Sequence, residues 1–229
     1  MARGKKERIQ ADKSKTKIVI VDDHPIVRQG LAELINHEQE LTVCGHAEDA
    51  HEALAIIKES EPDMVIVDIS LKETSGMELI KDIKAQYPNL PVLALSMHDE
   101  SLYAERALRA GAKGYIMKVE ATENVVTAIR KVLSGQIYVS DRMAAKMVRK
   151  LVGGRSQVGV SVIESLSDRE LEVFQLVGRG FGTRQIAERL HLSVKTIETY
   201  RAHIKEKLNL ADSSELLQYA IQWVSSQDK

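Results

Sequence analysis

The first half of the chain alternates short apolar runs with longer amphipathic stretches. The apolar runs are rich in Val and Ile and show no alternation with polar residues, as expected for strands that are covered on both faces. They comprise residues 18–21, 42–44, 64–67, 92–95 and 115–117. The intervening stretches repeat apolar residues at helical spacing, which predicts a helix after each strand. This alternation predicts an α/β fold, a doubly wound, five-stranded parallel sheet with helices on both faces.

The second half of the chain shows only helical periodicity. Ser167 and Glu170 have the spacing of a capping box, and Ser193 and Asp212 stand where they can cap two later helices. A Gly-rich segment at 178–182 separates the first two helices. These signals predict a small all-α domain of four helices.

The patterns divide the chain into four segments. Residues 1–14 are basic and lack periodicity, which predicts a flexible tail, and residues 15–136 form the α/β domain. Residues 137–160 are predicted to be a linker made of a short basic amphipathic helix, at 141–151, and a Gly-rich loop. Residues 161–229 form the helical domain.

Composition narrows the classes of function. The 229 residues include 32 Lys and Arg against 33 Asp and Glu, a formal net charge of −1, so contact with nucleic acid must depend on a local patch. The single cysteine, Cys44, excludes an internal disulfide and a cysteine-based zinc site and is typical of a reducing compartment. No apolar run approaches the roughly 18 residues of a membrane span. The sequence therefore predicts a cytoplasmic protein.

Acidic side chains follow two of the predicted strands. Asp22 and Asp23 come directly after the first strand, and Asp68 comes directly after the third. Because ligands collect at the carboxyl ends of parallel strands, these carboxylates are expected to converge. Their mutual repulsion favours a bound cation, and hard oxygen ligands favour Mg²⁺. The next strands lead into Ser96 and Lys118, a hydroxyl and an ammonium suited to an incoming anion such as a phosphoryl group.

Each of these residues also has an ordinary structural interpretation. Asp22 and Asp23 could be turn residues. Ser96 could begin a helix, and Lys118 could be a solvated strand end. Tyr115 could be an ordinary strand aromatic. A functional site is favoured because all of them fall at one edge of one predicted sheet.

The third helix of the second half, at about 194–208, has two distinct faces. Its core face is expected to carry Ile197, Tyr200, Ile204 and Leu208, with Val194 near the start. Its opposite face carries Lys195, Glu198, Thr199, Ala202 and Lys205, with Arg201 at the border. Such a face is often merely solvated, but the preceding helix and short turn have helix-turn-helix spacing. Acidic residues slightly outnumber basic ones in this half, so DNA binding depends on the basic residues concentrated on this helix.

The last helix, at about 216–224, has apolar residues on more than one face. They are Leu216, Leu217, Tyr219, Ala220, Ile221, Trp223 and Val224. One face would close the small core, and the surplus predicts a second buried surface. The alternative is a helix that caps only its own domain.

Four segments of the first half, IVIVDDHPIVRQGL, MVIVDIS, VLALSMHDE and GAKGYIMK, resemble the receiver domain of bacterial two-component response regulators, which has a flavodoxin-like fold. The resemblance implies that Asp68 accepts a phosphoryl group from a sensor histidine kinase. It implies that the ligands of Mg²⁺ are Asp22, Asp23, Asp68 and the backbone carbonyl of Ser70. It also implies that Ser96 and Lys118 bind phosphoryl oxygens and that Tyr115 turns inward when Ser96 moves.

Two positions depart from that family's pattern, and one rival function is disfavoured. Receivers often carry Pro in the loop after the acceptor and after the lysine, where this chain has Lys72 and Val119. A missing proline changes loop conformation but removes no catalytic group. A Mg²⁺-dependent phosphohydrolase would need a second carboxylate just beyond Asp68, where Ile69 and Ser70 stand. A DNA-binding regulator that works without phosphorylation remains the other alternative.

The second half, from LSDRELEVFQLVGRGFGTRQIAERL through HLSVKTIETYRAHIKEKLNLADSSEL, resembles the LuxR/NarL-type helix-turn-helix DNA-binding domain. The resemblance implies that base edges are approached by Glu198, Thr199 and Ala202. It implies that phosphates are contacted by Lys195, Thr196, Arg201 and Lys205. It also implies a homodimer through the last helix, with contacts from Leu216, Tyr219, Ala220 and Trp223.

Together the two resemblances imply a NarL/FixJ-type response regulator, a transcription factor and not an enzyme. Phosphorylation of Asp68 with Mg²⁺ as cofactor would shift the receiver to a state that promotes dimerisation and DNA binding. The expected partners are a sensor histidine kinase, a second copy of the chain and double-stranded DNA, with no membrane partner.

Overall fold

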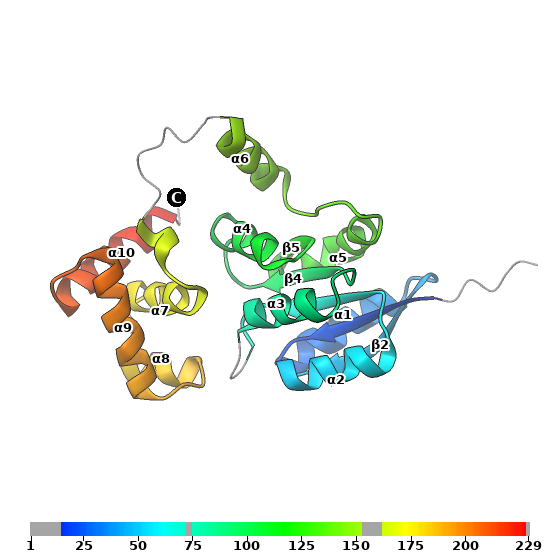
Figure 1. Cartoon of the computed structure of the whole chain (residues 1–229), viewed down its shortest axis with the longest axis horizontal. Helices are drawn as coiled ribbons and strands as arrows, with labels where there is room; N and C mark the ends of the chain where they lie inside the picture. The colour runs from blue at the N-terminus through cyan, green and yellow to red at the C-terminus, as the bar shows by residue number, and fades with distance from the viewer. Residues whose placement is uncertain (1–14, 72–74, 153–161, 228–229) are drawn as a thin grey trace, which may run out of the picture.

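The computed structural model describes residues 15–71, 75–152 and 162–227 (Figure 1). The tail predicted at 1–14, the Gly-rich loop predicted after the linker helix and Lys72 lie outside the described residues. The described chain forms two domains, an α/β domain followed by a helical one (Figure 1). Within the described residues, no helix is both long and apolar enough to cross a membrane.

A five-stranded parallel sheet with the order β2-β1-β3-β4-β5 forms the centre of the first domain, as predicted. Its strands are β1 (Thr16–Val21), β2 (Leu41–Ala47), β3 (Met64–Asp68), β4 (Val92–Ser96) and β5 (Gly114–Met117). The strand order changes direction between β1 and β3. At such a switch point the helices on either side diverge, which leaves a crevice at the carboxyl ends of the two strands.

Helices cover both faces of this sheet. They are α1 (Pro25–Asn36), α2 (Ala50–Ser60), α3 (Gly76–Gln86), α4 (Glu100–Ala110) and α5 (Lys118–Leu133). Ile18 and Ile20 of β1 pack in the core formed with α1 and α5. Val19 and Val21 pack in the core formed with α2, α3 and α4. Successive strand residues point to opposite faces, so continuous apolar runs in the central strands supply both cores.

β2 differs from the other strands because it is partly exposed. Leu41 and Ala47 at its ends are buried, but Cys44 is exposed and its neighbours are only half buried. The prediction that residues 42–44 are covered on both faces is wrong. β2 lies at one edge of the sheet, so only one of its sides pairs with a neighbouring strand, and the helices cover it incompletely.

A further helix, α6 (Asp141–Val152), occupies the position predicted for the linker helix. Hydrogen bonds connect the beginning of α6 to the first turn of α4. The Ser140 backbone N–H donates to the Glu100 Oε1 atom at 2.7 Å, and Lys146 Nζ donates to the Ser101 carbonyl at 3.1 Å. The beginning of α4 therefore holds the segment that leads to the second domain.

The second domain is helical, as predicted. Its elements are the 3-10 helix η1 (Val162–Ser165) and the α-helices α7 (Asp168–Gly178), α8 (Thr183–Arg189), α9 (Val194–Leu208) and α10 (Ser213–Gln227). Ser167 and Glu170 form the predicted capping box at the start of α7, and Ser193 caps α9. Gly178 lets α7 approach α10 closely, because a Cβ atom there would lie 2.5 Å from the Ala220 carbonyl oxygen.

Candidate functional site

Three carboxylates meet at the switch point between β1 and β3. Asp22 and Asp23 follow β1, Asp68 ends β3, and all three side chains are buried. One ligand atom from each, together with a ring nitrogen of His24, lies within 4.8 Å of the others. Three carboxylate oxygens in one buried cluster are a donor set that suits a hard cation such as Mg²⁺. The three aspartates predicted from the sequence are thus brought together.

Sequence reasoning did not assign His24 to this cluster. Its Nδ1 atom lies 2.7 Å from Asp23 Oδ1 and 3.2 Å from Asp22 Oδ1, while its side chain is mostly exposed. Its backbone N–H donates to Asp22 Oδ1 at 2.8 Å. The signal available in the sequence was its position directly after the acidic pair.

Lys118, predicted at this edge of the sheet, reaches two of the carboxylates. Its Nζ atom lies 2.7 Å from Asp22 Oδ2 and 2.7 Å from Asp68 Oδ2. Burial raises the pKa of the Asp68 carboxyl to about 6, and the Lys118 ammonium opposes that rise. Burial lowers the pKa of Lys118, but the two carboxylates outweigh burial and leave this pKa above its ordinary value. The lysine is therefore held charged against the central aspartate.

The backbone around Asp68 is fixed by a close approach of α3. The Gly76 N–H donates to the Ile69 carbonyl at 2.9 Å, and a Cβ atom on Gly76 would lie 1.9 Å from the Asp68 carbonyl oxygen. Only glycine fits at this position. The Ser70 N–H donates to Asp68 Oδ1 at 3.0 Å, so each carboxylate oxygen of Asp68 has a donor.

Ser96 ends β4 and Tyr115 lies in the neighbouring strand β5, and His98 connects them. Ser96 Oγ accepts a hydrogen bond from the His98 N–H at 2.9 Å, and the Tyr115 hydroxyl donates to the His98 carbonyl at 2.8 Å. Tyr115 is buried, so its side chain points inward. Burial raises the pKa of its hydroxyl, which stays protonated. The two residues predicted to form a switch thus share one neighbour.

The ring of His98 also bridges to Ser70. His98 Nε2 lies 3.0 Å from Ser70 Oγ, and burial lowers the pKa of this imidazole to about 4. The ring is therefore neutral near pH 7. Ser70 thus contacts both His98 and Asp68, whose side chain is only 1 % exposed.

A cavity of about 320 Å³ lies next to the cluster, between the two domains. The first domain contributes Asp23, His24 and Ser70 to its lining, and the second contributes Arg169 and His191 among others. Figure 1 shows α7 and α8 on the side of the helical domain that faces the α/β domain, with α9 farther away. The second domain therefore stands over the mouth of the acidic cluster.

The polar face of α9 is open. Ile197, Ile204 and Leu208 are buried as predicted and Tyr200 is half buried, whereas Val194 is exposed because it lies at the first turn. The predicted base-reading residues Glu198, Thr199 and Ala202 are exposed. Of the predicted phosphate contacts, Lys195 is exposed and Thr196, Arg201 and Lys205 are half buried. No contact with the α/β domain covers this face in the described part of the chain.

Polar contacts inside the domain engage some side chains of this helix. Thr196 Oγ1 lies 2.7 Å from Ser193 Oγ in the helix cap, and the Thr199 hydroxyl donates to the Lys195 carbonyl at 3.0 Å. Lys207, a further basic residue of α9, pairs with Glu170 at 2.6 Å. Lys207 therefore fixes α9 to the start of α7.

The predicted dimer residues of α10 fall into two groups. Leu216 and Ala220 are fully buried in the domain's own core, so they cannot meet a second copy. The ring of Trp223 packs edge-on against Phe174, 5.5 Å between centroids, and Tyr219 lies against the same ring. The apolar side chains exposed on this helix are instead Leu217, Tyr219 and Ile221, at 39 %, 36 % and 42 %.

Comparison with known proteins adds to this geometry. Residues 18–130 match the family described as response regulator receiver domain, and residues 164–220 match bacterial regulatory proteins, luxR family. The oxygen regulatory protein NreC of Staphylococcus carnosus is 37 % identical over 209 residues, which is 90 % of this chain and 96 % of the relative.

Two solved structures are similar to the chain as well. RcsB from Salmonella enterica serovar Typhimurium, bound to promoter rprA with the phosphomimetic BeF₃⁻, is 26 % identical with a TM-score of 0.59 and covers 90 % of this chain and 98 % of that one. A LuxR-family two-component response regulator from Aurantimonas sp. is 34 % identical with a TM-score of 0.56, over 61 % of this chain and 99 % of that one.

Proposed function

The chain belongs to the two-component response regulators that join a receiver domain to a luxR-family DNA-binding domain, and from this premise we propose how its residues act. It is a DNA-binding transcriptional regulator controlled by phosphorylation, and its receiver implies a kinase partner. It is a transcription factor and not an enzyme. The proposal concerns the roles of individual residues.

Asp68 is the proposed phosphoacceptor. A carboxylate oxygen of Asp68 forms the new bond to phosphorus as the bond between phosphorus and the donor breaks, and the donor leaves with that electron pair. With a sensor histidine kinase the leaving group is the imidazole of its phosphohistidine. The observation that carries this proposal is the buried cluster of Asp22, Asp23 and Asp68 with Lys118 at 2.7 Å from Asp68.

Asp22, Asp23, Asp68 and the Ser70 carbonyl are the proposed ligands of Mg²⁺. The clustered carboxylate oxygens fit this ion, and the single ammonium of Lys118 leaves the three carboxylates undercompensated. When bound, Mg²⁺ supplies positive charge that offsets the charge of the phosphoryl group.

Lys118 and Ser96 are the proposed partners of the phosphoryl oxygens. Lys118 already contacts the acceptor carboxylate, so its ammonium is placed to donate to the new group. Ser96 ends β4, the strand next to β3, and its hydroxyl retains a proton that it can donate. Tyr115, already inward, occupies the space behind Ser96 in the proposed active state.

In the second domain, α9 is the proposed recognition helix. Glu198, Thr199 and Ala202 would approach base edges. The neighbouring phosphates would be contacted by Lys195, Thr196, Arg201 and Lys205. A homodimer through the exposed apolar side of α10 would match two DNA half-sites.

One experiment tests the acceptor assignment. The protein is incubated with Mg²⁺ and acetyl phosphate, and the intact mass is compared for wild type, Asp68→Asn and Asp82→Asn. One phosphoryl adduct is expected on the wild type and on Asp82→Asn, whose exposed side chain lies on α3, and none on Asp68→Asn. An equal adduct on Asp68→Asn would assign the acceptor elsewhere.

A further inference from the structure

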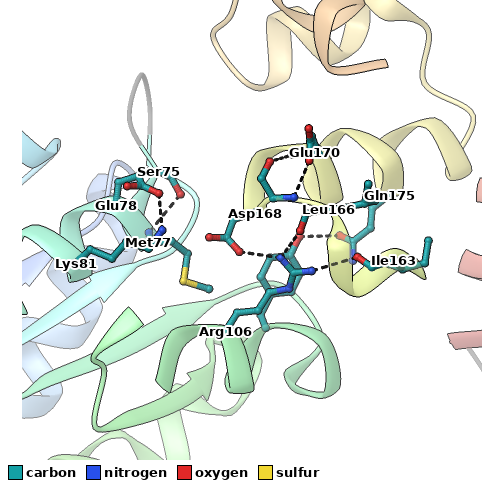
Figure 2. A network of polar contacts seen from close by, with 12 residues as sticks. Ser75, Met77, Glu78, Lys81, Arg106, Ile163, Leu166, Asp168, Glu170 and Gln175 are labelled. Atoms are coloured by element: carbon teal, nitrogen blue, oxygen red, sulfur yellow. Dashed lines mark hydrogen bonds and ion pairs between the residues drawn. The ribbon is translucent and has the colours of Figure 1, made fainter. Parts of the chain in front are cut away.

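The two domains are joined by a cationic contact from α4. Arg106 Nη1 donates to the Leu166 carbonyl at 2.7 Å and to Asp168 Oδ1 at 3.0 Å, and Nη2 donates to the Ile163 carbonyl at 3.3 Å. Figure 2 shows this guanidinium reaching from α4 to the segment that precedes and begins α7. The ion pair with Asp168 is largely buried. A charged, partly desolvated contact with three acceptors is a strong one.

A second contact joins the same two helices one turn earlier on α4. The Tyr103 hydroxyl points to Gln175 Oε1 of α7 at 3.4 Å, and both side chains are buried. On its other side, the Tyr103 ring stacks on the His98 ring, with 4.5 Å between centroids and 20° between planes. The helical domain is therefore in contact, through Tyr103, with the residue that bridges the phosphorylation site.

The bridge of His98 to Ser70 lies next to the acceptor, because the Ser70 N–H also donates to Asp68 Oδ1. Both Asp68 oxygens already have donors, and the side chain is 1 % exposed. A phosphoryl group on Asp68 adds three oxygens beside Ser70, the residue whose hydroxyl holds the His98 ring. His98 is the neighbour held by two hydrogen bonds to residues of the site, Ser70 and Ser96.

Docking of the helical domain does not hide the surface proposed to bind DNA. Glu198, Thr199 and Lys195 on α9 are exposed in this arrangement. Docking covers side chains of α4 instead, among others, since Tyr103 is buried and Arg106 is largely so. An effect of docking on activity must therefore pass through the receiver.

We propose that His98 is a positioning residue that couples docking of the helical domain to phosphorylation of Asp68. The proposal rests on the function assigned above to Asp68. In the docked protein, α7 holds Tyr103 and Tyr103 holds the His98 ring. The ring stays bonded to Ser70, whose N–H holds Asp68. Phosphorylation displaces the ring, which weakens the contact of Tyr103 with Gln175 and releases the domain. Docking in turn keeps the ring on Ser70 and thereby slows phosphorylation of Asp68.

The test measures the initial rate of adduct formation with acetyl phosphate and Mg²⁺ in the full chain, together with the radius of gyration by X-ray scattering. Arg106→Ala is expected to expand the molecule and to raise the rate about fivefold or more, which corresponds to about 1 kcal/mol in the barrier. The matched control is Arg109→Ala, since Arg109 lies on the same helix and pairs with Glu105 within α4. Its rate and dimensions should equal those of the wild type.

A double-mutant cycle tests the path through His98. His98→Phe keeps a ring on Tyr103 and removes the bond to Ser70. Its rate should be raised, and adding Arg106→Ala should raise it no further. Ser70→Ala breaks the same bond from the other side, so it should give the same result if His98→Phe does not fold.

Each contrary result has a distinct meaning. If the Arg106→Ala variant has a larger radius of gyration but an unchanged rate of adduct formation, docking does not oppose phosphorylation. If the Arg106→Ala variant has the same radius of gyration as the wild type, the Arg106 contact does not hold the helical domain in its docked position. Equal acceleration by Arg106→Ala in the wild type and in His98→Phe would overturn the path through His98. A wild type that forms no adduct would refute the proposed function itself, which none of the other results would do.

Discussion

The ammonium of Lys118 lies 2.7 Å from a carboxylate oxygen of Asp68, in a site where the side chains of both are almost fully buried. The same ammonium compensates Asp22. Removing one partner of a buried ion pair leaves an uncompensated charge. We therefore expect Lys118→Met to lower the free energy of unfolding by about 3–5 kcal/mol without Mg²⁺. Urea denaturation measures this, with exposed Lys113→Met as the control. If Lys118→Met lowers the free energy of unfolding no more than Lys113→Met does, the ion pair of Lys118 with Asp68 is already well solvated.

Mg²⁺ should stabilise the receiver through its proposed ligands. A ligand that binds only the folded state at ten times its dissociation constant adds about 1.4 kcal/mol to the free energy of unfolding. We expect thermal denaturation of wild type and Asp82→Asn to shift upward with Mg²⁺, and that of Asp23→Asn not to shift. A full shift in Asp23→Asn would remove this aspartate from the ligand set.

Two substitutions on α9 should have different effects on DNA binding. The Thr199 hydroxyl donates to the Lys195 carbonyl in the structure and is proposed to contact a base in the complex with DNA. Thr199→Ala removes this hydroxyl, so it should change which sequences are selected from a random pool. Lys205→Ala removes a proposed phosphate contact. It should weaken all sequences alike and reduce the slope of log affinity against log salt by about 1. If neither variant changes affinity or selection, α9 does not read DNA.

The exposed apolar residues of α10 provide the test of dimerisation. Ile221→Ser and Leu217→Ser should cost little stability, because both side chains are well exposed. Each should shift phosphorylated protein toward monomer in sedimentation velocity. Trp223→Ala is less suitable, since the ring packs on Phe174 and its loss would disturb the core. An unchanged dimer in both serine variants would place the interface elsewhere.

The start of α7 gives the second domain a dependence on pH. Burial raises the pKa of Glu170, but hydrogen bonds from Lys207 and Ser167 outweigh burial, so this pKa lies below its ordinary value. A lowered pKa in the folded state contributes stability that is present above the unfolded pKa of about 4.3 and is lost as pH falls through the folded pKa. Glu170→Gln should reduce the loss in free energy of unfolding at acid pH, measured by denaturation monitored through the fluorescence of Trp223. Glu188→Gln, at an exposed position, should not.

The sequence was sufficient to predict the helices and strands that are marked by a local signal, such as a continuous apolar run or a helix cap. Continuous Val and Ile runs placed the central strands, and the aspartates that follow them met because strand ends of one parallel sheet meet. Ser167 with Glu170 marked the start of α7 for the same reason, since a cap is a local interaction.

What the sequence did not predict depends on contacts between distant segments. Arg106 looks like any helix arginine until α7 is placed beside α4. The bridge between Ser70 and His98 joins two loops, and no periodicity connects them. In α10, apolar residues on several faces did not reveal that Leu216 and Ala220 fill the core while Leu217 and Ile221 face outward. Burial is decided by the neighbours, and the neighbours come from other helices.

The open face of α9 has a consequence for the resting cell. With α9 as the proposed recognition helix, a protein whose proposed DNA-binding surface is uncovered before any stimulus arrives can already visit promoters, at an occupancy set by the affinity of a single copy. The stimulus would then lengthen the residence of molecules that are searching the chromosome, instead of recruiting molecules that were excluded from it.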